Sequence, residues 1–230
     1  MKRKIIMTGD GSNSVEIAGT DETYHSRFGA IQESKHVFIE AGLQSFLKNN
    51  ETIHIFEMGF GTGLNALLTF IEAESHQQKI YYEAIEFFPL EEELIASLNY
   101  FEILERKDLK EIFHQLHSCE WGKEINISAY FSFKKIKASL IDHSFSSLYN
   151  LIYYDAFAPN AQPELWTVEI FEKLFAHLFD NGILVTYCSK GNVRRALISA
   201  GFTVEKLKGP KGKREMIRAI KKGKTGIISD

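Results

Sequence analysis

Glu57-Met58-Gly59-Phe60-Gly61-Thr62-Gly63-Leu64-Asn65 carries the strongest fold signal in this chain. Apolar residues from 52 to 56 precede it and predict a buried strand, and an apolar helical pattern follows it to residue 71. A glycine-rich turn between a strand and a helix is typical of nucleotide-binding folds, because glycine permits tight turns and close approach of a ligand. The stretch therefore predicts an α/β fold with a ligand site at this turn.

The glycine spacing is G-x-G-x-G, which differs from the G-x-G-x-x-G pattern of dinucleotide-binding turns. Together with the acid Glu57 it indicates S-adenosylmethionine (SAM) rather than NAD. Glu86 ends the next predicted strand, where a carboxylate can accept hydrogen bonds from both ribose hydroxyls. The neighbouring Phe87 is expected to pack against the ribose or the adenine.

A second acid, Asp155, ends a later predicted strand within Asp155-Ala156-Phe157-Ala158-Pro159. If the methyl acceptor is an amine, a carboxylate at this edge can orient the amine and take up its proton. The alternative is a structural acid that caps the next helix. Phe157 and Pro159 are expected to frame a flat base or exclude water, and Tyr24 either closes over the site or packs against the core.

Strands and helices alternate along the chain, which predicts a mostly parallel sheet in a Rossmann-like α/β fold. We expect seven strands, an antiparallel strand near the C-terminus, and a small hairpin and helix extension at the N-terminus. Residues 1–48 would form this extension, and residues 49–230 the main domain. The expected strands are 52–56, 80–85, 125–133, 150–154, 183–187, 203–207 and 215–220, and the expected helices are 31–47, 64–74, 90–98, 104–116, 164–178 and 192–200.

Composition narrows the class of protein further. The 230 residues suit one domain, and the two cysteines form no C-x-x-C pair, which argues against a disulfide scaffold and indicates a reducing compartment. The sequence predicts no signal peptide, no membrane span and no metal site, so we expect a cytoplasmic protein. His114 and His117 lie three residues apart without an evident third ligand, and we expect them at the surface.

Charge is distributed unevenly along the chain. Residues 190–224 contain 12 lysines and arginines but only two acids, whereas the whole chain has a net charge of −3. A basic segment on an acidic body indicates a docking face for a polyanion. A solvated surface is the alternative.

Several motifs together resemble the methyltransferase domain of the bacterial MnmC family, which completes 5-methylaminomethyl-2-thiouridine at the tRNA wobble position. The similar stretches cover nearly the whole chain. The most specific are Asp155 to Thr167, with Asp-x-Phe-Ala-Pro and Pro-x-x-Trp-Thr, and Gly212-Lys213-Arg214-Glu215-Met216. The others are Glu22 to Phe38, the glycine turn, Glu86 to Leu90, and Arg194 to Met216, which contains the last of these motifs.

The resemblance implies SAM-dependent methylation of the aminomethyl nitrogen on the modified uridine. Asp155 would engage that amine, and Tyr24 would line the pocket. The residues implied to hold SAM are Glu57, Gly59, Gly61, Gly63, Asn65, Glu86 and Phe87, and those implied to contact tRNA phosphates are Arg194, Arg195, Lys211, Lys213 and Arg214.

Two departures from the family pattern follow from the sequence. Two-domain members carry an FAD-dependent oxidase domain, whereas this chain ends at Asp230, so separate enzymes are expected to supply the aminomethyl substrate. Lys134 and Lys135 stand where an acid that reads adenine is expected.

Other functions remain open: an N-methyltransferase for a small free amine, a non-catalytic SAM- or RNA-binding module and, more distantly, an oxidoreductase.

Overall fold

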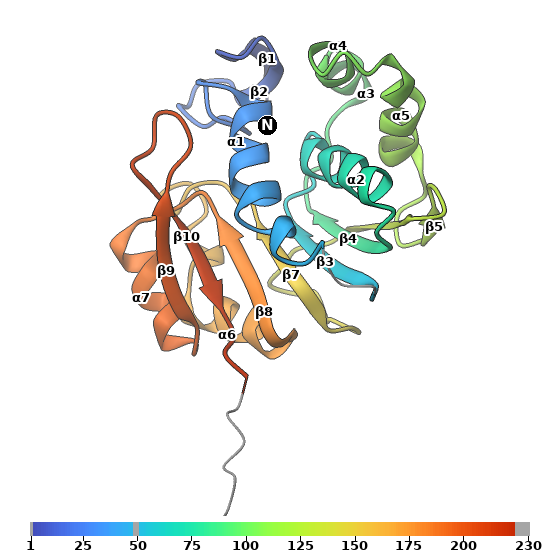
Figure 1. Cartoon of the computed structure of the whole chain (residues 1–230). Coiled ribbons are helices and arrows are strands. Elements are labelled where there is room, and N and C mark those ends of the chain that lie inside the picture. Colours follow the sequence, from blue (N-terminus) through green and yellow to red (C-terminus); the bar gives the residue numbers. More distant parts are fainter. Residues whose placement is uncertain (1, 48–50, 224–230) are drawn as a thin grey trace, which may run out of the picture.

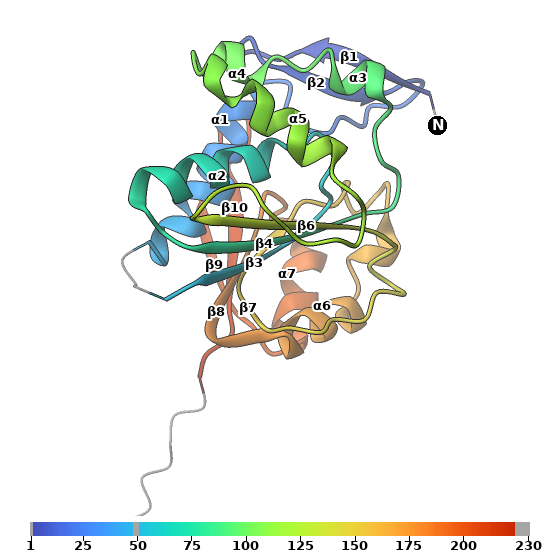
Figure 2. The same ribbon diagram turned by 90° about the vertical axis from the view of Figure 1, so that its right-hand side faces the viewer.

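The computed structural model describes residues 2–47 and 51–223, and within them an eight-stranded sheet lies between two layers of helices (Figures 1 and 2). Helices α1, α2 and α5 cover one face of the sheet, and α6 and α7 cover the other. The strands of the sheet are β3(Ile53–Met58), β4(Ile80–Glu86), β5(Ile125–Asn126), β6(Phe131–Lys137), β7(Tyr149–Tyr154), β8(Leu178–Thr186), β9(Thr203–Lys208) and β10(Glu215–Ile220). The main helices are α1(Ala30–Ser34), α2(Leu64–His76), α3(Glu92–Ile95), α4(Tyr100–Ile103), α5(Lys110–Ser118), α6(Val168–Ala176) and α7(Gly191–Ser199).

The order of strands across the sheet is β5-β6-β4-β3-β7-β8-β10-β9. The strands from β6 to β8 pair in parallel, and β10 is antiparallel to both of its neighbours. This confirms the Rossmann-like prediction, with one strand more than the seven expected. The additional strand arises because the predicted strand 125–133 is two elements, the short β5 and the longer β6, which pair antiparallel.

Successive side chains of the central strands point to opposite faces of the sheet, so the hydrophobic core is divided between the two helical layers. Ile55 of β3 belongs to the hydrophobic cluster that includes α2 residues, whereas the next residue, Phe56, belongs to the cluster that includes α6 residues. Leu151 and Ile152 of β7 are divided in the same way. Because successive side chains of a strand point to opposite faces, Glu57 shares the α2 side of the sheet with Ile55.

The N-terminal hairpin consists of β1(Arg3–Met7) and β2(Asn13–Ile17), as predicted. It lies beside α3 and α4 at the top of both views (Figures 1 and 2). The Asn13 backbone N–H donates to Asn99 Oδ1 at 2.7 Å, and Arg3 Nη1 donates to the Pro89 carbonyl at 2.8 Å. The expected boundary between residues 48 and 49 lies outside the described residues, so the division into two parts stays a prediction.

Several predicted helix boundaries are wrong. The helix expected over 31–47 is α1 followed by a π-helical segment, Lys35–Glu40, and a short 3₁₀ turn, Leu43–Ser45. The helix expected to run to residue 178 ends at Ala176, and β8 begins at Leu178. Asn181 adopts a φ of +64° inside β8, where the register with β7 shifts, so this residue marks an irregularity within the strand.

The helix predicted over 90–98 is shorter, as α3, and the one predicted over 104–116 is α5, which begins later and runs to Ser118. Helix α4 lies between the two predicted ranges and was not predicted. Within the described residues, none of the helices has the length and apolar character needed to cross a bilayer.

Candidate active site

The glycine turn joins β3 to α2 and lies against the end of β7. Gly59, Gly61 and Gly63 have φ values of +90°, +50° and +72°. A Cβ on Gly59 would lie 2.7 Å from the Asp155 carbonyl oxygen, and the Asp155 N–H donates to the Met58 carbonyl at 3.0 Å. Positive φ and this close approach both favour glycine, so the turn brings the ends of β3 and β7 together.

Glu86 at the end of β4 is tied to the same turn. Its Oε2 accepts the Gly61 N–H at 2.9 Å, and its Oε1 accepts the Phe88 N–H at 2.7 Å. Its neighbour Phe87 is 52% exposed. The carboxylate therefore lies at the edge of the glycine turn, where the sequence predicts it.

Asn65, in the first turn of α2, links two acids. Its Nδ2 donates to Glu57 Oε1 and to Asp155 Oδ2, each at 2.9 Å. Glu57 is fully buried, and burial raises the pKa of its carboxyl well above the usual value. One amide group thus supplies hydrogen bonds to acids from two neighbouring strands.

The Asp155 carboxyl has an environment suited to proton transfer near neutral pH. Burial, and then the negative charge of Glu33, raise its pKa to about 7, while the hydrogen bond from Asn65 and the positive charge of Lys213 act in the opposite direction. A carboxyl with a pKa near the working pH can exchange a proton with a bound amine.

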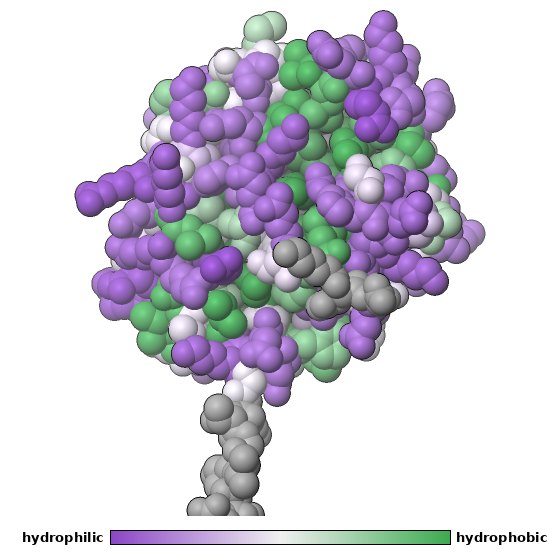
Figure 3. Space-filling model, viewed as in Figure 1, coloured by the Kyte–Doolittle hydropathy of each residue, from purple (hydrophilic) through white to green (hydrophobic). Residues whose placement is uncertain are grey.

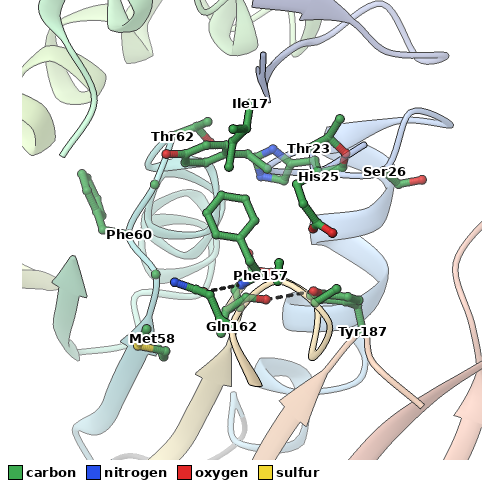
Figure 4. Close-up of a pocket in the computed structure, with 18 of the residues that line it drawn as sticks. Ile17, Thr23, His25, Ser26, Met58, Phe60, Thr62, Phe157, Gln162 and Tyr187 are labelled. Carbon is green, nitrogen blue, oxygen red and sulfur yellow. Dashed lines mark hydrogen bonds between the residues drawn. The ribbon is translucent and has the colours of Figure 1, made fainter. Parts of the chain in front are cut away.

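A cavity of about 370 Å³ opens at the carboxyl ends of β3, β4 and β7. Phe157 projects into it from the loop after β7, toward Thr62 and His25 (Figure 4). The Tyr24 ring packs edge-on against Phe157, with centroids 5.0 Å apart, and Tyr24 also lies against Gly61. A residue of the N-terminal extension thus closes one side of the cavity.

Most of the predicted site residues meet at this cavity. Its wall includes Gly59, Gly61, Asn65, Glu86, Phe87, Asp155, Phe157, Tyr24 and Lys213. Glu57 and Gly63 lie behind the wall, and the link from Glu57 to the cavity runs through Asn65. Pro159 is buried outside the wall, so its predicted place in the pocket is wrong.

Lys213 differs from the other basic residues predicted to contact tRNA. Its Nζ donates to Glu33 Oε1 at 2.7 Å and lies 3.9 Å from the centroid of the Tyr187 ring. Glu33 carries no sequence signal of a site role, because an acid within a predicted helix resembles a surface residue. Arg194, Arg195, Lys211 and Arg214 are exposed, and the surface of the projecting β9–β10 turn is hydrophilic (Figure 3).

His117 is not a surface residue, contrary to the prediction. Its Nε2 donates to the Thr62 carbonyl at 3.0 Å and lies close to Gly63, and burial lowers its pKa to about 4. The imidazole therefore supports the glycine turn as a neutral group. His114 is exposed, as expected.

The two lysines placed at the adenine-reading position lie within β6, which continues to Lys137. Lys134 Nζ lies 3.1 Å from Glu83 Oε2, and the buried Lys135 Nζ donates to the His117 carbonyl and lies 4.5 Å from the Trp121 ring centroid. Their assignment to the strand end was wrong, because the strand is longer than its apolar pattern suggests.

The cavity fits SAM in size and in the chemistry of its wall. Its volume lies within the range of small-molecule sites, roughly 300–1,000 Å³. Asn65 Oδ1 is a buried acceptor without a partner among the described residues, and side chains at Gly59 or Gly61 would meet Asp155 or Tyr24. The Glu86 carboxylate lies on the same wall, at the end of β4.

The strand order, the glycine turn after β3 and the acid at the end of β4 define the class of SAM-dependent methyltransferases. A family model described as S-adenosyl-L-methionine-dependent methyltransferase matches residues 101–222, and the chain belongs to this family.

Among curated relatives, the chain is 33% identical over 222 residues to the tRNA 5-methylaminomethyl-2-thiouridine biosynthesis bifunctional protein MnmC of Pseudoalteromonas atlantica, covering 87% of this chain and 31% of that protein. The protein of the same name from Campylobacter hominis is 30% identical over 213 residues, covering 90% of this chain and 31% of that protein. The chain thus spans about a third of the length of these relatives.

Solved structures agree with the fold. The crystal structure of MNMC2 from Aquifex aeolicus superposes with a TM-score of 0.78 at 25% identity, covering 95% of this chain and 69% of that one. Spermidine synthase from Thermotoga maritima superposes with a TM-score of 0.55 at 14% identity, covering 96% of this chain and 69% of that one, and shows a shared fold alone.

Proposed function

We propose that this protein methylates the exocyclic amine of 5-aminomethyl-2-thiouridine at the tRNA wobble position, giving 5-methylaminomethyl-2-thiouridine. The observation that carries the proposal is the Asp155 carboxyl on the cavity wall, held by Asn65 beside the glycine turn. The similarity to MnmC proteins and to MNMC2 supports the choice of substrate.

SAM supplies, when bound, a methyl group on a positively charged sulfur. Asp155 holds the acceptor amine by accepting its N–H bonds and takes up the proton that the ammonium must lose before the nitrogen lone pair can attack. Its pKa of about 7 matches this role near neutral pH. Tyr24 and Phe157 form an aromatic wall that excludes water and can pack against the flat uracil ring.

Within the proposed SAM site, Glu86 binds the ribose hydroxyls, and Gly59, Gly61 and Asn65 give the ligand close access to the backbone and to a free amide oxygen. Phe87 packs beside the nucleoside. Glu57 and Gly63 act indirectly, through Asn65 and through the shape of the turn.

In the proposed docking mode, the exposed Arg194, Arg195, Lys211 and Arg214 contact tRNA phosphates. Lys213 is oriented toward Glu33 instead, which argues for a role inside the site. A tRNA substrate is consistent with the expected cytoplasmic location, and separate enzymes would supply the aminomethyl group.

Comparison of acceptors tests this proposal. Labelled SAM would be offered with tRNA bearing 5-aminomethyl-2-thiouridine, with the free modified nucleoside, or with a polyamine. Efficient labelling of the tRNA alone supports the proposal. Preferential labelling of either small amine would instead support the alternative of a small-amine N-methyltransferase.

A further inference from the structure

An ion pair between a half-buried lysine and a buried glutamate lies on the cavity wall beside Asp155, between two segments distant in sequence. Lys213 belongs to the β9–β10 turn and Glu33 to α1, and their side chains are 33% and 8% exposed. Glu33 Oε2 also accepts the Ser26 N–H at 2.6 Å. Hydrogen bonds to both of its oxygens hold the Glu33 carboxylate in place.

Lys213 is also connected to the loop that carries Asp155. Its Nζ lies over the Tyr187 ring, and the Tyr187 hydroxyl donates to the Ala156 carbonyl at 2.8 Å (Figure 4). The turn itself is fixed nearby, because Phe28 packs directly on Gly212. Lys213 thus contacts Glu33 directly, and Tyr187 links it to Ala156, the residue after Asp155.

We propose that Lys213 and Glu33 are positioning residues for Asp155, with Lys213 balancing the Glu33 carboxylate so that Asp155 can take up the proton of the acceptor amine. This inference rests on the proposed role of Asp155. Two carboxylates facing one cavity oppose each other's ionisation, and a lysine paired with one of them relieves this repulsion. Without Lys213, Glu33 would leave an uncompensated negative charge near the reacting carboxyl.

The charges that act on Asp155 come from several elements. Glu33 raises its pKa and Lys213 lowers it, after the dominant effect of burial. The titratable groups that interact with it are Glu33 of α1, Glu57 of β3, Tyr82 of β4, Tyr187 after β8 and Lys213 of the β9–β10 turn. Lys213 is the one cation among them in the described residues.

The test is a pH titration of the Asp155 carboxyl by ¹³C NMR on protein labelled at aspartate, with the Asp155 signal assigned from Asp155→Asn. Lys213→Met should move the midpoint upward by about one pH unit, because a cation that favours the ionised form is lost. Glu33→Gln should move it downward. The double variant Glu33→Gln/Lys213→Met should return close to the wild-type midpoint.

Lys211→Met is the matched control, since it removes a lysine from the same turn whose side chain is exposed. Its Asp155 midpoint should equal that of the wild type, and Lys213→Arg should also stay close to wild type. An unchanged midpoint in Lys213→Met, or a double variant as displaced as Lys213→Met, would overturn the inference. If Lys213→Met does not fold, the Asp155 midpoints of Glu33→Gln and of the double variant still test the inference.

The titration needs neither SAM nor tRNA, so it remains decisive if the proposed tRNA methylation fails. With an active acceptor, the acid limb of the pH profile of kcat should move in the same directions as the NMR midpoints. If the acid limb of the kcat profile stays fixed while the NMR midpoint of Asp155 moves, the Glu33–Lys213 pair does not act on proton uptake by Asp155.

Discussion

The Asn65 side-chain amide donates a hydrogen bond to the Asp155 carboxylate at 2.9 Å and so connects the start of α2 to the end of β7. Removing this donor in Asn65→Ala should raise the pKa of Asp155, because the hydrogen bond favours the ionised form. The acid limb of the kcat profile should therefore move to higher pH. Asn160→Ala, an exposed change outside the cavity wall, is the control and should leave the limb in place.

Replacement of Asp155 itself tests its role in the reaction. Asp155→Asn keeps the size of the side chain but removes the base, and should lower kcat by roughly 10²–10⁴-fold. SAM affinity, measured by calorimetry, should barely change, because Asp155 engages the acceptor. Full turnover by this variant would refute the assignment.

Replacement of Glu86, in contrast to that of Asp155, should act on SAM affinity. Glu86→Ala should weaken SAM binding by about tenfold to a hundredfold, because both proposed ribose hydrogen bonds are lost. It also removes the acceptor of the Gly61 and Phe88 N–H groups, so a small drop in melting temperature is expected. Glu86→Gln retains one acceptor oxygen and should lose less affinity. Equal SAM affinity in wild type and Glu86→Ala would exclude the ribose contact.

The raised pKa of Asp155 also predicts a pH dependence of stability. The carboxyl ionises near 3.8 in the unfolded chain but near 7 in the folded one, so the folded state binds more protons between these values. Its contribution to the free energy of unfolding is therefore lost as pH rises from about 4 to 7.

Asp155→Asn should remove this contribution and be more stable than wild type at pH 7.5, by about 1–3 kcal/mol in urea unfolding. At pH 4 the difference should nearly vanish. A variant that is less stable than wild type at pH 7.5 would show that the ionised carboxyl is favoured in the folded state.

The exposed basic turn should control tRNA affinity through salt-dependent contacts. Lys211→Gln/Arg214→Gln should weaken tRNA binding and reduce the slope of log K against log salt by about two, if each residue neutralises one phosphate. Lys107→Gln/Lys110→Gln removes the same charge beside α5, away from the β9–β10 turn (Figure 1), and serves as control. Identical slopes for the two variants would reject a specific docking face.

The sequence predicted the sheet well, because the apolar runs of β3 and β7 and the glycine turn are local signals. It also located Asp155 and Glu86, since carboxyl ends of parallel strands meet at one edge of the sheet. It misplaced Lys134 and Lys135, because polar residues inside β6 look like the end of a strand. The expected strand 183–187 begins too late for a similar reason, because Asn181, a residue typical of turns, lies within β8.

The Glu33–Lys213 pair could not be predicted from the sequence. Its partners are separated by most of the chain, and each has a local context typical of a surface residue. Their pairing depends on how the N-terminal extension and the β9–β10 turn fold over the end of β7. The support of Thr62 by His117 is similar, because only the packing of α5 brings the imidazole to the glycine turn.

The decisive experiment is transfer of labelled methyl from SAM to tRNA carrying 5-aminomethyl-2-thiouridine, with unmodified transcript as the control acceptor. We expect label on the modified tRNA, none on the transcript, and a loss of roughly 10²–10⁴-fold in Asp155→Asn. Absence of label on the modified tRNA, while SAM binds normally, would contradict the proposed tRNA methylation.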